Sequence, residues 1–286
     1  MTHVCRGCRL GHHRVEGKVN QIKVSICLML CLVAPALPAS ADGGFELPGS
    51  FSHAFHSDVL DDDFSIVVST PFGYGRSERN YPLLFALDGD GMFGMESDIP
   101  RLLSFEGKVP PMIVASVVYG SPQKWFQKRA RDFHPPKDGA TGGAEAFLNS
   151  LRDEIIPFLQ ENYPVDAGDM ALYGHSSAGL FAVYASVKEP QLFNRVLATS
   201  PSLEEEPAWS ATFLEMIASN KAGLPKIYMS VDASEAAMAE AVKPHVAAFS
   251  ARLGEGKFKY ELLGEGSHMS VIPKAYNAGL HFLYAN

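Results

Sequence analysis

The stretch MALYGHSSAGLFAVYASV, residues 170–187, decides the fold class and raises the question of function. It begins with an apolar run of strand length, passes through small residues around Ser176, and continues as an apolar run of helical length. Its centre nearly matches G-x-S-x-G, in which a sharp strand-to-helix turn holds a reactive serine. Gly174 and Ser176 match, whereas the fifth position is Ala178 and the glycine follows at Gly179.

Such a turn would give Ser176 the two properties of a nucleophile. Strained backbone would aim its hydroxyl above the sheet, and the following helix N-terminus would favour negative charge. The backbone N–H of Ser177 would then be one oxyanion donor. The alternative is an ordinary helix N-cap with small neighbours. Ser177 also competes as nucleophile, but the glycine spacing fits Ser176 better.

Working outward, short apolar runs alternate with helical patterns along the chain. Strands are expected at residues 64–68, 83–87, 112–118, 170–174, 195–199, 226–231 and 258–263. Helices are expected at about 144–162, 176–187, 235–253 and 272–284, with Pro244 kinking or splitting the third. This alternation predicts an α/β fold with a mainly parallel central sheet and helices on both faces. Ligands of such sheets bind at the carboxyl ends of the strands.

A base for Ser176 is expected late in the chain, because this fold orders its triad as serine, acid, histidine. His268 lies in GEGSHMSV, a glycine-rich loop after the last expected strand, and can reach back to the serine. His175 is expected to point elsewhere from the turn. His245 and His281 fall in helical runs, so a surface and a packing role are expected for them.

The acid should follow the strand KIYMSV, where Asp232 and Glu235 both stand. A catalytic carboxylate there would orient His268 and stabilise its imidazolium. The same residues also fit a capping box, with Asp232 as N-cap and Glu235 reaching back from position N3. The residues alone leave the two carboxylates, and the two interpretations, open.

A second oxyanion donor is expected in LLFALDGDGMF, residues 83–93, after an early strand. Gly89 would permit a tight turn, and the backbone N–H of Asp90 is the candidate donor. The D-G-D-G run also resembles part of a calcium loop. The remaining oxygen ligands are missing at the required spacing, so no metal is expected.

The first 41 residues carry the marks of a secretory leader. Basic residues precede an apolar segment at 24–37 that is too short to span a bilayer, and a small-x-small site at 39–41 predicts cleavage after Ala41. All four cysteines, at positions 5, 8, 27 and 31, lie in this leader, so a C-x-x-C metal site is not expected in the mature chain. Residues 42–286 are expected to form a single domain, periplasmic or secreted.

The charge of the mature chain limits its partners. Without residues 1–41 it keeps 19 basic and 31 acidic side chains, a net charge of −12 with histidine neutral. This balance disfavours binding of nucleic acid or an anionic membrane through a basic face. After leader cleavage we expect no stable membrane association. The 47% hydrophobic content of the 286 residues is ample for a folded core.

One long loop is expected to matter for ligands. Residues 119–143 include WFQKRARDFHPPKDGATGG, rich in proline, glycine and charge. Such a segment is either a lid or substrate loop or an ordinary surface excursion. A second long loop is expected at residues 70–81.

Four segments in order resemble one esterase family of the α/β-hydrolase superfamily, which includes enterochelin and salmochelin siderophore esterases. They are YPLLFALDGD, GHSSAGLFAVYA, FNRVLATSPSL and GEGSHMSVIP. The resemblance covers nearly the whole chain from about Phe51. It departs at Ala178-Gly179, where many relatives have two glycines.

The resemblance implies roles for individual residues. It places the nucleophile on Ser176, the base on His268 and the acid on Glu235 rather than Asp232. It points to the N–H groups of Asp90 and Ser177 for the oxyanion. RARDFHP resembles a segment near the substrate of siderophore esterases, which implies substrate contacts for Arg129 and Asp132, with Arg131 as an added charge.

Together these features predict an exported serine esterase that needs no cofactor. A catecholate siderophore trilactone is one expected substrate, bound as a ferric complex that is substrate and not cofactor. Because ferric tris-catecholate is anionic, Lys128, Arg129 and Arg131 are expected to attract it, unless they are only solvated loop charges. A general acyl or carbohydrate esterase, an acyltransferase, and a non-catalytic binding protein on the same fold are the alternatives.

Overall fold

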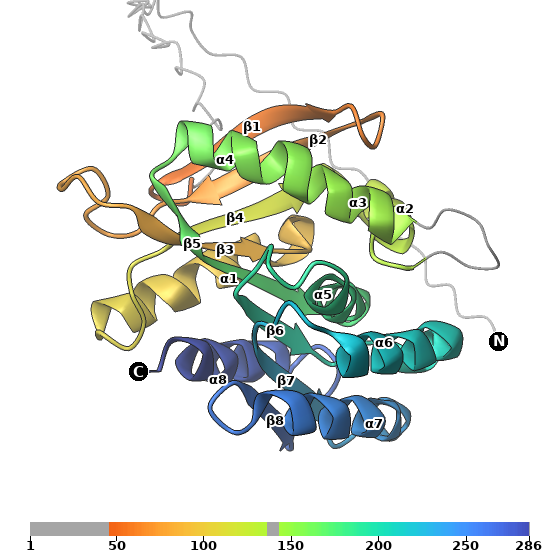
Figure 1. Ribbon diagram of the computed structural model, residues 1–286. Coiled ribbons are helices and arrows are strands. Elements are labelled where there is room, and N and C mark those ends of the chain that lie inside the picture. Colours follow the sequence, from red (N-terminus) through yellow and green to blue (C-terminus); the bar gives the residue numbers. More distant parts are fainter. Residues whose placement is uncertain (1–45, 136–142, 286) are drawn as a thin grey trace, which may run out of the picture. The chain divides into compact units, whose positions relative to one another are not determined.

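The computed structural model describes residues 46–135 and 143–285, which build one eight-stranded sheet (Figure 1). The predicted leader lies outside the described residues. The strand order is β1-β2-β4-β3-β5-β6-β7-β8, with β2 antiparallel to both of its neighbours and the other pairs parallel. The strands are β1 (Ser50–Ser57), β2 (Asp62–Ser69), β3 (Tyr81–Ala86), β4 (Ile113–Val118), β5 (Val165–His175), β6 (Arg195–Thr199), β7 (Lys226–Asp232) and β8 (Phe258–Leu263). The predicted α/β-hydrolase fold is confirmed.

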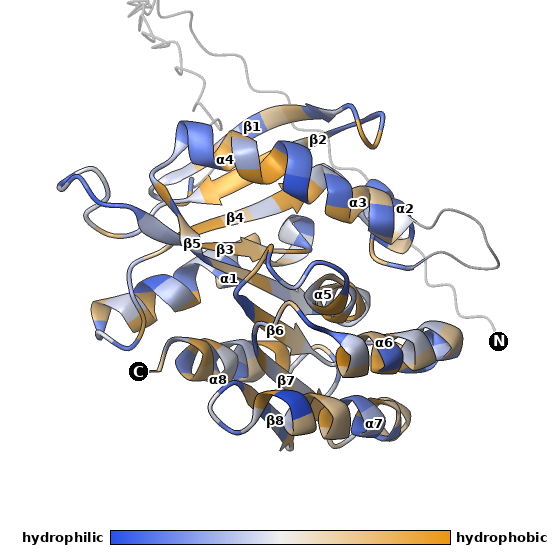
Figure 2. Cartoon of the chain, viewed as in Figure 1, coloured by the Kyte–Doolittle hydropathy of each residue, from blue (hydrophilic) through white to orange (hydrophobic). Residues whose placement is uncertain are grey.

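The central strands are apolar throughout because both of their faces are covered. Along β3, Leu83 and Phe85 enter one core and Leu84 and Ala86 the other, as the two-residue period of a strand requires. Each of these four side chains is completely buried. Figure 2 shows the same apolar character in the middle of the sheet.

Two layers of helices cover the sheet. One face is covered by α1 (Gly89–Phe105) and α8 (Ile272–Tyr284), which pack together at Tyr276 and Glu96. The other core contains side chains of α3 (Gly143–Ser150), α4 (Ile156–Asn162), α5 (Ser177–Lys188), α6 (Pro207–Ser219) and α7 (Ala236–Leu253). A π-helical turn (Leu151–Ile155) joins α3 to α4. This layering leaves the loops at the carboxyl ends of the strands to form the site (Figure 1).

The structure differs from the expected elements where local pattern is weak. The edge strand β1 was not expected, because SFSHAFHS is polar and partly exposed. α1 begins with glycines and contains Pro100, and it was missed along with α6. Within the loop expected at 119–143, the structure forms the helix α2 (Pro122–Asp132), N-capped by Ser121. Of the kink or split expected at Pro244, the split does not occur, because α7 continues through this residue as one helix.

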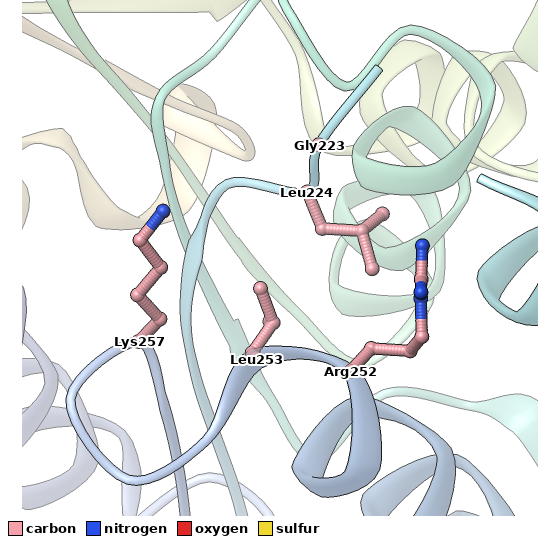
Figure 3. Close-up of a pocket in the computed structure, with 5 residues that line it drawn as sticks. All are labelled: Gly223, Leu224, Arg252, Leu253 and Lys257. Carbon is pink, nitrogen blue, oxygen red and sulfur yellow. The ribbon is translucent and has the colours of Figure 1, made fainter. Parts of the chain in front are cut away.

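A hollow of about 320 Å³ lies at the amino-terminal edge of β7 and β8. In Figure 3, Leu224 and Leu253 form its centre, and Arg252 and Lys257 stand on either side. The side chain of Arg252 donates to the carbonyl of Asn220. Because this hollow is at the opposite ends of the strands from the Ser176 turn, it is separate from the site described next.

Candidate active site

Ser176 is the single residue between β5 and α5, and its backbone is strained. Its φ of 61° and ψ of −123° are unfavourable for a residue with a side chain. Its amide donates to the carbonyl of Thr199 at 3.0 Å, which ties the turn to the neighbouring strand β6. The strand, the turn and the helix therefore form the nucleophile elbow that the sequence pattern indicates.

The small residues around the elbow are required by close backbone contacts. A Cβ on Gly174 would lie 2.1 Å from the carbonyl oxygen of Ala178, and one on Gly179 would lie 2.8 Å from that of Thr199. Ala178 itself is completely buried in the larger core, which therefore accommodates its methyl group. The departure from the two-glycine pattern thus leaves the elbow intact.

Ser176 and His268 line the same pocket, although 91 residues separate them in sequence. The pocket has a volume of about 230 Å³. Its lining consists of Met92, Trp125, Phe126, Arg129, His175, Ser176, His268 and Met269. Met92 comes from the first turn of α1 and Trp125 to Arg129 from α2, while His268 and Met269 belong to the loop after β8. The two residues expected to react are therefore on one surface.

Glu235 contacts the Nδ1 atom of His268 with its Oε1 atom. Its Oε2 atom accepts hydrogen bonds from the Ser200 hydroxyl at 2.6 Å and from the Asp232 amide at 3.0 Å. Asp232 instead accepts from the amide and hydroxyl of Ser234. Glu235 thus reaches back to Asp232 as in a capping box and touches His268 with the same carboxylate, so both interpretations of this segment apply.

Two serines after β6 contact Ser176 and Glu235, and neither was predicted from the sequence. The hydroxyl of Ser202 lies 3.3 Å from that of Ser176, and its amide donates to the Ser176 carbonyl at 3.3 Å. Ser200, at a φ of 42°, holds Glu235. The family-like segment FNRVLATSPSL contains both serines, so its polar end after an apolar strand was the available signal.

The two expected oxyanion donors are the amides of helical first turns. Ser177 is the first residue of α5 and Asp90 the second of α1, where amides lack carbonyl partners within the helix. The left-handed residue in the turn before α1 is Asp88, at a φ of 72°, and a Cβ on Gly89 would lie 2.6 Å from the hydroxyl of Ser116. The side chain of Asp90 accepts from the amides of Tyr119 and Gly120, at 2.7 and 2.8 Å. These bonds join the start of α1 to the loop after β4.

His175 faces the site, although it was expected to point away from it. Its ring lies 4.6 Å from that of His268, measured between centroids, and its Nδ1 atom is 2.9 Å from the Thr199 hydroxyl. Burial, together with the nearby charges of His268 and Arg129, lowers the pKa of His175 to about 3. The imidazole of His175 is therefore neutral near pH 7.

Arg129 lines the pocket but is bonded to the protein. Its Nε atom donates to Asp88 at 2.7 Å, and its Nη2 atom donates to the carbonyl of His175 at 2.9 Å. Trp125 donates to the same Asp88 oxygen at 2.8 Å. Burial raises the pKa of Asp88, and the hydrogen bonds and charge of Arg129 oppose that rise. Arg129 therefore connects α2 to the elbow and to the turn before α1.

Arg131 and Asp132, also expected to contact substrate, lie outside the pocket lining. Arg131 donates to both oxygens of Asp132, at 2.6 and 3.0 Å, and to Asp62 at 2.7 Å. Asp132 is completely buried and also accepts from the hydroxyl of Tyr119 at 2.7 Å. These contacts hold α2 against β2 and against Tyr119, the residue after β4, and neither Arg131 nor Asp132 lines the pocket that contains Ser176.

The described part of the chain shows neither a metal cluster nor a membrane-spanning helix. Within 46–135 and 143–285, no three His, Cys, Asp or Glu side chains are grouped so that they could hold a metal ion. No helix in the same residues is long and apolar enough to cross a bilayer.

The fold and this arrangement define an α/β-hydrolase with a serine at the nucleophile elbow. Residues 57–281 match the family model described as "Putative esterase". Because the match spans most of the sequence, the chain belongs to that esterase family.

Individual relatives agree with this membership. The chain is 25% identical to ferri-bacillibactin esterase BesA from Bacillus subtilis over 189 residues, covering 59% of this chain and 63% of that protein. It is 31% identical to the siderophore triacetylfusarinine C esterase of Aspergillus fumigatus over 150 residues, covering 49% and 51%. The matches thus span less than two thirds of these relatives. The solved BES protein from Bacillus cereus has the same fold, with a TM-score of 0.74 at 20% identity over 85% of this chain and 98% of that one.

Proposed function

We propose that this protein is an exported serine esterase that hydrolyses ester bonds of siderophores. The observation that carries the proposal is the shared pocket of Ser176 and His268, with Glu235 in contact with the Nδ1 atom of that imidazole. The substrate class rests on the relatives, two of which are named for siderophore esters. Export, to the periplasm or outside the cell, rests on the leader-like residues 1–41.

The first half of the reaction follows from which imidazole nitrogen is free. Because Nδ1 of His268 faces Glu235, Nε2 is the atom left to accept the proton of Ser176. The serine Oγ atom then bonds to the ester carbonyl carbon, and the carbonyl oxygen becomes an oxyanion. The amides of Ser177 and Asp90 stabilise that charge.

The second half reverses these proton movements. The C–O bond to the alcohol breaks as His268 returns its proton to the leaving oxygen, which leaves an acyl group on Ser176. His268 next takes a proton from water, which attacks the acyl carbon and releases the acid. Glu235 keeps one tautomer of His268 throughout and stabilises its charged form.

The test is ester turnover by purified protein that begins at Asp42. The substrates are p-nitrophenyl butyrate and a siderophore triester, with Ser176→Ala as the comparison. We expect turnover by the wild type and a loss on the order of 1,000-fold or more in the variant. Equal turnover by Ser176→Ala would refute the nucleophile, and failure of the wild type on every ester would refute the esterase.

A further inference from the structure

The pocket around Ser176 is apolar, and its one formal cation is already paired. Met92, Trp125, Phe126 and Met269 supply most of the wall. Phe126 and Met269 are 63% and 58% exposed, which places their apolar surface where an incoming substrate meets the pocket. Of the two histidines, His175 is held neutral by burial. Arg129 is only 16% exposed and is bonded to Asp88.

Every cation that the sequence offered for attracting an anion has a carboxylate partner. Arg129 pairs with Asp88, whereas Arg131 pairs with Asp132 and Asp62. Lys128 also pairs with Asp62. Three basic side chains of α2 are thus balanced by three carboxylates. Lys124, exposed and next to Trp125 in sequence, is the basic residue of α2 for which the described residues show no ion pair.

The other side of the site is acidic. Glu204 and Glu205 form the short helical turn directly after Ser202, whose hydroxyl neighbours that of Ser176. The half-buried Glu204 is close enough to interact electrostatically with Glu235 and His268. An anionic substrate would therefore lose hydration against an apolar wall, with like charges nearby and no unpaired Lys or Arg among the residues that line the pocket.

From this arrangement we propose that the pocket selects esters whose bound portion carries no net charge, and that it rejects anionic ones. The inference rests on the proposed esterase function and specifies its substrate class. Among iron complexes it favours a ferric trihydroxamate triester, which is neutral, over a ferric tris-catecholate trilactone, which is a trianion. It opposes the expectation, drawn from the charges of α2 alone, that this helix attracts a ferric catecholate.

The test compares two p-nitrophenyl esters of similar acyl length, one neutral and one anionic. We would measure kcat/KM for p-nitrophenyl valerate and for the mono-p-nitrophenyl ester of succinic acid, each corrected for its hydrolysis without enzyme. We expect the neutral ester to be preferred by about 100-fold or more, because an uncompensated charge is costly in such a pocket. The rate on the anionic ester should rise with added salt, which screens repulsion, and that on the neutral ester should not.

A matched pair of variants isolates the pocket from the net charge of the protein. Met269→Lys adds a cation to the exposed pocket wall. It should reduce the ratio of kcat/KM for the neutral ester to kcat/KM for the anionic ester by about tenfold or more. Phe105→Lys adds the same charge at a side chain that is 82% exposed at the far end of α1, and the preference should stay unchanged. Lys124→Gln should also leave it unchanged, since the inference assigns no substrate role to that lysine.

The outcomes separate the two proposals. Comparable kcat/KM values for the neutral and anionic esters, or faster cleavage of the ferric tris-catecholate trilactone than of the ferric trihydroxamate triester, would overturn the inference while the esterase stands. A drop in anionic turnover in Lys124→Gln would also overturn it. No Ser176-dependent turnover of any ester would remove the proposed function and the inference together.

Discussion

Replacing Glu235 by glutamine would separate the two roles of its carboxylate. One oxygen contacts His268, and the other accepts from Ser200 and from the amide of Asp232. A glutamine has one oxygen and one NH₂ group, so it can satisfy one of these sides only. The side chain is 10% exposed, so water cannot readily replace the missing partner.

In the Glu235→Gln variant, the amide orientation that keeps the hydrogen bonds from Ser200 and Asp232 prevents His268 from acting as the base. If the amide oxygen faces Ser200 and Asp232, the NH₂ group faces Nδ1 of His268 and forces that atom to accept. The proton then moves to Nε2, the nitrogen that should take the proton of Ser176. A wrong tautomer of this kind costs on the order of 10,000-fold in kcat. In the opposite orientation the NH₂ group faces the Ser200 hydroxyl and the Asp232 amide, which are donors too. Each unpaired group then costs about 1–3 kcal/mol of stability.

The assay is kcat on p-nitrophenyl butyrate, combined with the free energy of unfolding in urea. We expect Glu235→Gln to lose kcat by about 1,000-fold or more while unfolding at nearly the wild-type urea concentration. Asp232→Asn is the control: its side chain bonds Ser234, so kcat should change by less than about tenfold. A Glu235→Gln enzyme within threefold of the wild type, or an equal loss in Asp232→Asn, would refute the assignment of the acid.

Three further predictions concern the elbow. Gly174→Ala should destabilise the fold by several kcal/mol, because the added methyl group would meet the carbonyl of Ala178. Gly264→Ala is the control: a methyl group there meets nothing within 4 Å, so the thermal midpoint should stay nearly unchanged. Ser176→Gly should abolish turnover. It should also raise the free energy of unfolding by about 1 kcal/mol, because glycine adopts the φ and ψ of this turn without strain. An unchanged or lower thermal midpoint would show that the turn is not strained. The pKa of His175 is lowered to about 3, so the unfolded chain binds its proton first as the pH falls below about 6.5. Stability is therefore lost between about pH 6.5 and pH 3, by at most about 5 kcal/mol, and urea unfolding of His175→Gln should show a flatter pH dependence.

The local pattern predicts the inner part of the sheet because its strands are buried on both faces. Continuous apolar runs therefore identify β3 to β7, and the run of small residues identifies the elbow. β1 and α2 escape the same reasoning, since an exposed edge strand and a charged helix have no continuous apolar run. Their places depend on contacts with distant parts of the chain.

The same limit applies to the site. Ser176 and His268 could be proposed from order and loop context, and a single turn contains both Asp232 and Glu235, so local pattern could not choose between them. The charges of α2 were harder to interpret. The partners of Arg129 and Lys128 are Asp88 and Asp62, each about 40 or more residues away along the chain. A sequence shows the charge of a side chain, but it does not show whether folding neutralises it.

The anchoring of α2 has a practical consequence for redesign. Its inward basic residues are anchored by ion pairs to Asp62 and Asp88, which lie outside the helix, whereas Gln123, Phe126 and Gln127 face solvent. Of these three, Phe126 lines the pocket, so substitutions at this position should change which acyl groups the proposed esterase accepts without loosening the helix. Residues of the pocket wall can thus vary in sequence without changing the residues proposed to carry out the reaction.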